Sequence, residues 1–231
     1  MPSDSTFQPT RPPAAAIEAL AERARALQDS TGGRVILGIT GSPGSGKSKI
    51  ARALVKRINR AHPATAAYLP MDGFHLANST LVQLGLRDAK GSIDTFDGWG
   101  FLALLDRLRS ETGHTIYAPS FKRDIDEGVA GENAIPADAR IVVVEGNYLL
   151  MGQEPWGRVR DRLTEAWFCA TDAEEREMRL VRRHTRHGLT HEAATAWARD
   201  VDGANAVLIE TSRHRADLVL SGTTGEPLHE Q

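Results

Sequence analysis

The segment "GITGSPGSGKSKIARAL", residues 38–54, decides the fold class of this chain. It contains the pattern G-x-x-x-x-G-K-S, which is typical of phosphate-binding P-loops. The members of the pattern are Gly41, Ser42, Pro43, Gly44, Ser45, Gly46, Lys47 and Ser48. An apolar run precedes the pattern and a helix-forming run follows it, as a strand–loop–helix unit requires. This context disfavours the alternative, a glycine-rich turn that binds nothing.

The chemistry of this loop predicts a nucleoside triphosphate as its ligand. Glycines allow several backbone N–H groups to turn toward one anion, and the N-terminus of the following helix adds a positive dipole end. We expect Lys47 to reach the β- and γ-phosphates and the Ser48 hydroxyl to ligate Mg²⁺. The guanine-selecting pattern N-K-x-D does not occur in the sequence, which argues against a GTPase.

Composition limits the possible partners. The 231 residues suffice for one sizeable domain, and a net charge of -2 gives the whole surface no attraction for nucleic acid or an anionic membrane. The single cysteine, Cys169, excludes an internal disulfide. No apolar run approaches the ~20 residues that span a bilayer. We therefore expect a disordered tail over 1–12, one domain over 13–231, a cytoplasmic location, and neither nucleic acid nor membrane as a partner.

Apolar, β-branched runs alternate with helix-forming runs along the chain. Strands are expected at 34–40, 66–72, 114–121, 141–144, 165–171 and 216–220, and helices at 13–29, 48–61, 100–111, 173–187 and, in at least two pieces, 190–212. The alternation predicts an α/β fold, namely a P-loop NTPase three-layer sandwich with a mostly parallel sheet, helices on both faces and a helical lid. Asp172 and Glu175 fit a capping box, and the last eleven residues are expected to form a frayed tail.

Two acids follow predicted strands, where ligands bind in open α/β sheets. Asp72 could accept a proton from an attacking hydroxyl or hold Mg²⁺ through water, and the alternative is an ordinary Asp-Gly turn. Glu145 directly follows the apolar run Ile141–Val144, where a Walker B acid sits, and the alternative is a surface glutamate at a strand end.

One face of the helix 173–187 carries four arginines at positions i, i+3, i+4 and i+7: Arg179, Arg182, Arg183 and Arg186. Like charges at this spacing repel unless anions intervene, although Glu175 can pair with Arg179. We interpret the segment 179–205 as a lid whose arginines close over a transferring phosphoryl group. The alternative is a solvated basic face.

These segments together resemble the uridine kinase, phosphoribulokinase and type I pantothenate kinase group of P-loop kinases. The resemblance rests on the P-loop and on "MDGFHLAN", "KGSIDTFD", "YAPSF" and "VVVEGNYLL", and it runs from about Val35 to Leu220. The C-terminal part looks most like the bacterial nucleoside/nucleotide kinase family proteins, some of which are named fructose-transport-system kinases. The resemblance implies ATP- and Mg²⁺-dependent phosphorylation of a small-molecule alcohol, and a homodimer is possible because homodimers are common in the group.

The resemblance also implies roles for individual residues. Asp72 matches the general base of the family. The other catalytic residues are matched by Lys47, Arg183 and Arg186, and the metal-binding residues by Ser48, Glu145 and Asp72. The implied acceptor pocket comprises His75, Asn78, Lys90, Phe96, Asp97 and Tyr117. Pro119 stands where pantothenate kinases carry a histidine, and Lys122 stands where many relatives carry an acid. We interpret Lys122 as favouring a phosphorylated or carboxylated acceptor.

The residues leave the acceptor open between a nucleoside, a sugar and a pantothenate-like alcohol. A different class of function is an ATP-hydrolysing regulatory protein with no small-molecule acceptor, and a third is an inactive phosphate-binding relative. The segments "DGFH…N" and "KG…TFD" favour a kinase, because they supply a pocket and an acid that a pure switch does not need.

Overall fold

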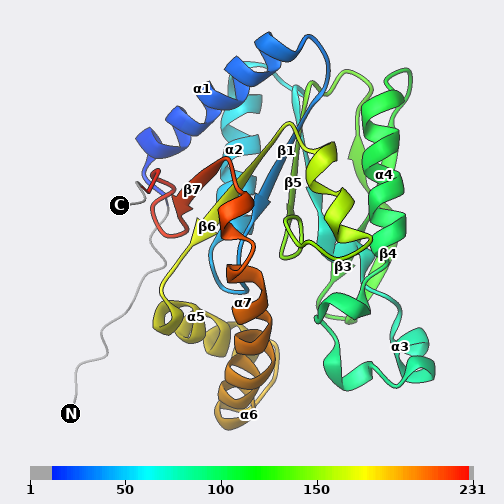
Figure 1. Cartoon of the computed structure of the whole chain (residues 1–231), viewed down its shortest axis with the longest axis vertical. Helices are drawn as coiled ribbons and strands as arrows, with labels where there is room; N and C mark the ends of the chain where they lie inside the picture. The colour runs from blue at the N-terminus through cyan, green and yellow to red at the C-terminus, as the bar shows by residue number, and fades with distance from the viewer. Residues whose placement is uncertain (1–11, 229–231) are drawn as a thin grey trace.

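The computed structural model describes residues 12–228 and is organised around a five-stranded parallel sheet in the order β2-β5-β1-β6-β7 (Figure 1). The strands are β1 (Val35–Thr40), β2 (Ala66–Pro70), β5 (Ile141–Gly146), β6 (Glu165–Ala170) and β7 (Leu218–Ser221). In register, β1 pairs with β5 from Val35 opposite Ile141 to Thr40 opposite Gly146. Both strands are buried along their whole length, which explains their continuous apolar sequences.

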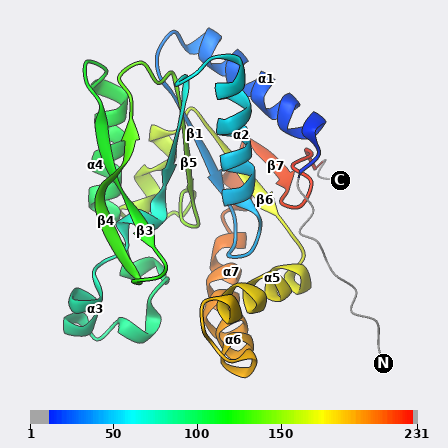
Figure 2. The ribbon, with the colours of Figure 1, turned by 180° about the vertical axis from the view of Figure 1, so that it is seen from behind.

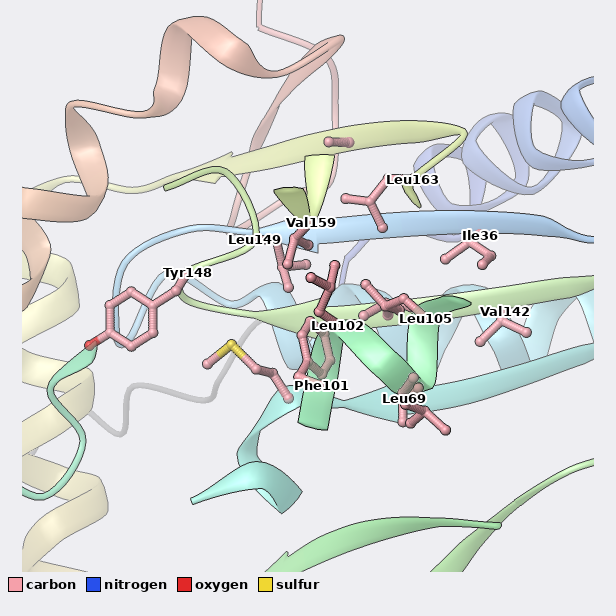
Figure 3. Close-up of a cluster of buried hydrophobic side chains, with 14 of the residues drawn as sticks. Ile36, Leu69, Phe101, Leu102, Leu105, Val142, Tyr148, Leu149, Val159 and Leu163 are labelled. Atoms are coloured by element: carbon pink, nitrogen blue, oxygen red, sulfur yellow. The ribbon is translucent and has the colours of Figure 1, made fainter. Parts of the chain in front are cut away.

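Helices cover both faces of this sheet, so the predicted three-layer P-loop fold is confirmed (Figures 1 and 2). Helices α1 (Ala14–Thr31) and α2 (Lys47–Ala61) pack on one face, where Leu37 and Ile39 of β1 point. Helix α4 (Gly98–Ser110) packs on the other face, where Figure 3 shows Phe101, Leu102 and Leu105 of this helix in one buried cluster with Ile36. Alternate residues of the central strand therefore belong to two separate cores.

A separate antiparallel hairpin lies beside the main sheet. It consists of β3 (Ile116–Lys122) and β4 (Glu127–Ile135), with a break in pairing between Ala118 and Ser120. The sequence predicted β3 as part of the parallel pattern and did not predict β4. The hairpin packs directly on Gly73, since a Cβ there would lie 2.3 Å from the Pro119 carbonyl oxygen. This contact places the middle of β3 against Gly73, the residue after Asp72.

The remaining elements lie at the end of the molecule that holds the P-loop, on either side of it (Figures 1 and 2). On one side are α3 (Asn78–Leu84), η2 (Arg87–Ala89) and η3 (Ile93–Thr95), which follow η1 (Met71–Phe74). On the other side are α5 (Ala173–Arg186), α6 (His191–Trp197), a π-helical turn, η6 (Ala198–Asp202), and α7 (Gly203–Glu210). Short 3-10 turns complete the chain: η4 (Trp156–Arg158), η5 (Arg160–Arg162) and η7 (Arg213–Arg215).

Two local predictions were wrong. Asp172 occupies the N-cap of α5 but makes no side-chain capping bond. Glu175 does not complete the capping box either, since its carboxylate accepts from Arg179 and Thr223. The predicted frayed tail covered residues 221–231. Its described part, 221–228, is ordered by hydrogen bonds, since the Ser221 N–H donates to the Glu226 carbonyl at 2.8 Å. Residues 229–231 and almost all of the predicted tail 1–12 lie outside the described residues. Within 12–228, no helix is long and apolar enough to cross a membrane.

Candidate active site

The P-loop connects β1 to α2 in a conformation that its glycines make possible. Gly44 and Gly46 have φ angles of 78° and 96°, which L-residues with a side chain rarely adopt. A Cβ on Gly46 would also lie 2.1 Å from the Gly222 carbonyl oxygen, so the turn after β7 leaves no space for a side chain. The sequence therefore needs glycine here for both backbone angle and close packing.

Segments that follow β6 hold the P-loop in place. Thr171 Oγ1 donates to the Ser45 carbonyl at 2.9 Å, and Arg179 Nη1 donates to the Gly44 carbonyl at 3.1 Å. Ser42 Oγ donates to Glu210 Oε1, at the end of α7, at 2.7 Å. Arg179 is therefore part of the support of the loop and does not point freely into the site.

Glu145 and Ser48 form a candidate Mg²⁺ site beside the loop. Ser48 Oγ donates to Glu145 Oε1 at 2.9 Å, and the Tyr68 hydroxyl donates to the same oxygen at 2.8 Å. Glu145 is 4% exposed, and its Oε2 has no hydrogen-bond partner among the described residues. Burial raises the pKa of Glu145, although the charge of Lys47 opposes this effect. An unsatisfied carboxylate oxygen beside a serine hydroxyl and a phosphate-binding loop fits Mg²⁺.

No group of three or more His, Cys, Asp or Glu side chains able to hold a metal occurs within residues 12–228. Mg²⁺ in nucleotide sites usually keeps several waters and takes one or two protein oxygens together with substrate phosphates.

Asp72 lies in η1, directly after β2, with its side chain 31% exposed. Its Oδ2 is 3.3 Å from Arg123 Nη2, and its carbonyl is 2.7 Å from His75 Nδ1. Burial opposes ionisation, but nearby positive charge, from His75 when it is protonated and from Arg123, Lys47 and Arg183, holds the pKa of Asp72 below its ordinary value. Burial also lowers the pKa of His75, so this imidazole is neutral at pH 7. Asp72 is therefore an ionised acceptor for a proton.

A cavity of about 450 Å³ joins these groups. Of the residues that the sequence predicted for a site, it brings together Pro43, Lys47, Ser48, Asp72, His75, Lys90, Phe96, Glu145 and Arg183. Three buried polar atoms of lining residues have no partner within the described chain: Glu145 Oε2, Asn147 Oδ1 and Arg183 Nε. Buried polar atoms normally have partners, so water or a polar ligand in the cavity would satisfy these three.

Four predicted catalytic or acceptor-pocket residues do not line this cavity, and neither do five of the predicted P-loop residues, Gly41, Ser42, Gly44, Ser45 and Gly46. Asn78 supports its wall by accepting from Lys90 Nζ at 2.6 Å, and Asp97 caps α4 by accepting from the Gly100 N–H at 2.8 Å. Tyr117 is 64% exposed on the hairpin, and Arg186 is exposed on α5. The predicted arginine face is thus divided, because Arg183 reaches the cavity while the neighbouring arginines face the loop or solvent.

Lys122 also does not take the position predicted for it. Its ammonium pairs with Glu132 across the hairpin and lies outside the cavity lining. The next residue, Arg123, enters the cavity instead and contacts Asp72. Lys122 was singled out because it stands where many relatives carry an acid, and that correspondence does not tell which way a side chain at the end of β3 points.

Apart from Arg183, sequence reasoning missed the residues that the helical segment contributes to the cavity. Asp202 is 7% exposed, and its Oδ2 is 2.7 Å from His184 Nε2 while its Oδ1 is 4.0 Å from Arg183 Nη2. Trp197 and Asn205 line the same wall. These residues belong to no short motif, and Asp202 lies in a π-helical turn that periodicity does not reveal. Arg87 and Asp126, on the opposite wall, were missed for the same lack of a motif.

The P-loop between β1 and α2, the parallel sheet and the helical segment beside the loop define a P-loop kinase fold. The chain belongs to the phosphoribulokinase / uridine kinase family, whose model matches residues 36–224. The resemblance found in the sequence is thereby confirmed.

Individual relatives agree with this assignment. The chain is 31% identical to the "Putative uridine kinase C227.14" of Schizosaccharomyces pombe, over 81% of this chain and 83% of that protein. It is 30% identical to a pantothenate kinase of Streptococcus pyogenes, over 52% of this chain and 39% of that protein. The crystal structure of a "putative fructose transport system kinase" from Silicibacter sp. TM1040 is similar with a TM-score of 0.80 and 35% identity, over 88% and 98% of the two chains.

Proposed function

We propose that this protein is an ATP- and Mg²⁺-dependent kinase that transfers the γ-phosphoryl group to a hydroxyl of a small molecule. The observation that carries the proposal is the single cavity in which Lys47, Ser48, Asp72, Glu145 and Arg183 meet. A nucleotide-dependent switch would need the P-loop and Glu145, but it would not need an ionised acid in a chamber with space for a second substrate.

The phosphates of ATP would lie against the P-loop, with Lys47 on the β- and γ-phosphates. Ser48, and Glu145 and Asp72 through water, would hold Mg²⁺, which neutralises charge on these phosphates when it is bound. The unpartnered Oε2 of Glu145 supports this assignment. Ionisation of Glu145 would then be favoured by the metal charge that compensates its burial.

Asp72 would orient the acceptor hydroxyl and take its proton. The acceptor oxygen forms a bond to the γ-phosphorus as the bond from that phosphorus to the bridging oxygen breaks, and ADP leaves. Arg183 would balance charge on the transferring group, since its Nε is buried without a partner in the described structure. Trp197 and Leu189, from the same side, would limit the access of water that could hydrolyse ATP.

The test is ADP release from ATP·Mg²⁺ across sugars, nucleosides, hydroxy acids and pantothenate, with Asp72→Asn in parallel. The proposal predicts that at least one alcohol stimulates release and that the variant loses this stimulation. ADP release that no acceptor stimulates, and that Asp72→Asn leaves intact, would favour an ATP-hydrolysing regulatory protein instead.

A further inference from the structure

The wall of the cavity opposite the helical segment carries an excess of positive charge. Three cations line it, Arg87, Lys90 and Arg123, against the carboxylates of Asp126 and Asp72. Asp72 is the proposed base and would be directed at the acceptor hydroxyl. The part of the acceptor beyond its reacting hydroxyl would therefore face three positive side chains and one carboxylate, that of Asp126.

Lys90 is already committed to holding the wall together. Its side chain is 5% exposed, and its Nζ donates to Asn78 Oδ1 at 2.6 Å and to the Asp126 carbonyl at 2.5 Å. It also lies 5.1 Å from the ring centre of Phe121. These bonds fix the turn of the β3–β4 hairpin, where Asp126 has a positive φ of 53°.

Arg87 and Arg123 differ from Lys90, because each guanidinium uses little of its bonding capacity. Arg87 Nη2 contacts Asp126 Oδ2 at 3.0 Å, and Arg123 Nη2 contacts Asp72 Oδ2 at 3.3 Å. Within residues 12–228 these are the hydrogen bonds that the two guanidinium groups make, and their side chains are 43% and 45% exposed. A guanidinium has five N–H donors in a planar fork that suits carboxylate and phosphate.

Both arginines line the cavity and are connected through the hairpin turn. Arg87 pairs with Asp126, which lies three residues after Arg123 in the same turn. Each arginine makes one half-exposed ion pair in the absence of a ligand. Such a pair contributes little to the free energy of unfolding, so a ligand can replace the carboxylate with a small loss of free energy. The aromatic residues of this wall are packed on one another, since His75 lies 4.0 Å from Phe96 and 4.5 Å from Phe121 between ring centres.

We infer that the acceptor alcohol carries an anionic group, a carboxylate or a phosphate, which Arg87 and Arg123 bind. This inference rests on the proposed kinase function. Arg123 would move from Asp72 to the anion, and Asp72 would then be released to accept the proton of the acceptor hydroxyl. The same exchange would keep Asp72 paired in the absence of acceptor and so disfavour activation of water.

Binding is measured first, by thermal unfolding with saturating ADP·Mg²⁺ so that the P-loop is occupied. The probes are two matched pairs, glycerate with glycerol for the carboxylate and glucose 6-phosphate with glucose for the phosphate. We expect at least one anionic probe to raise Tm by several degrees, its neutral partner to have no effect, and Arg87→Gln/Arg123→Gln to lose the shift. Lys122→Gln, which removes a neighbouring charge outside the cavity, should keep it.

Transfer is then measured with the same pairs. The inference predicts that kcat/KM for the better anionic probe exceeds that for its neutral partner roughly tenfold or more and that Arg123→Gln removes this preference. Equal Tm shifts with neutral probes, no shift with either anion, or a shift that persists in the double variant would overturn it. A shift lost in the double variant, without phosphorylation of any alcohol, would support the anion site and contradict the kinase function.

Discussion

The P-loop side and the acceptor side of the cavity differ in how the chain holds them. Three hydrogen bonds of 2.7–3.1 Å fix the P-loop: Thr171 and Arg179 donate to its carbonyls, and Glu210 accepts from its Ser42 hydroxyl. On the acceptor side, Arg87 and Arg123 are held by single contacts and are half-exposed. Under the proposed function, the firmly held P-loop would bind ATP, the substrate that the kinases of this family share. The loosely held arginines would bind the acceptor, the substrate that differs between them.

The comparison predicts the largest effect on the rigid side. Lys47→Ala should reduce kcat/KM by roughly 10²–10³ or more, because it removes a positioned charge from the transferring group. The measurement is a steady-state assay with the best acceptor. Lys56→Ala, on the exposed face of the same helix, is the matched control and should retain activity. Equal rates for the two variants would contradict the P-loop assignment.

Asp72→Asn tests whether Asp72, which lies between the P-loop and the acceptor side of the cavity, acts as the general base. The amide cannot accept the proton of the acceptor, so kcat should fall by roughly 10²–10⁴ while the Kd for ATP changes little. Titration calorimetry and turnover, measured on the same preparation, separate the two effects. A matching loss of ATP affinity would remove the general-base role and leave Asp72 as a metal or structural residue.

A smaller effect is expected for Asp202→Asn in the helical segment. The variant weakens the contacts with His184 and Arg183, so kcat should fall about tenfold and the free energy of unfolding by about 1–3 kcal/mol. Asp200→Asn is the control, since Asp200 is exposed and pairs only with Arg199 among the described residues. A stability loss without any change in kcat would show that Asp202 does not position Arg183.

The smallest effect concerns Glu145 and the dependence of stability on pH. Burial raises its folded-state pKa above the ordinary value of 4.5, so the folded state retains a proton that the unfolded state loses as pH rises. The free energy of unfolding of the wild type should therefore fall relative to Glu145→Gln as pH increases above 4.5, without nucleotide or metal. Urea titrations at several pH values measure the difference, and a rise would mean that Glu145 ionises easily in the apo-protein.

The rigid side is also the side that could be predicted from sequence. The P-loop, the buried strand before Glu145 and the position of Asp72 follow from local patterns, because glycine spacing and continuous apolar runs carry their own structural meaning. The hairpin strand β4 escaped prediction, since most of its residues are exposed and it pairs outside the main sheet. Lys122 was singled out because it stands where many relatives carry an acid, and that correspondence does not reveal that Arg123, in the turn after β3, enters the cavity instead.

The helical segment shows the same limit. Four arginines at helical spacing predicted one functional face, yet Arg179 supports the P-loop, Arg183 enters the cavity and Arg186 is exposed. Which arginine reaches the site depends on where α5 packs against the loop and on the turn after β7. That turn was expected to be a frayed tail, and tertiary contacts with Thr223 decide its structure.

The most direct test of the account is ³¹P NMR of ATP·Mg²⁺ with the protein and the acceptor that best stimulates ADP release. The account predicts a new phosphomonoester resonance that grows with ADP in the wild type and is nearly absent with Asp72→Asn. Inorganic phosphate as the sole product, formed at equal rates by both proteins, would contradict phosphoryl transfer to an alcohol and the role of Asp72 together.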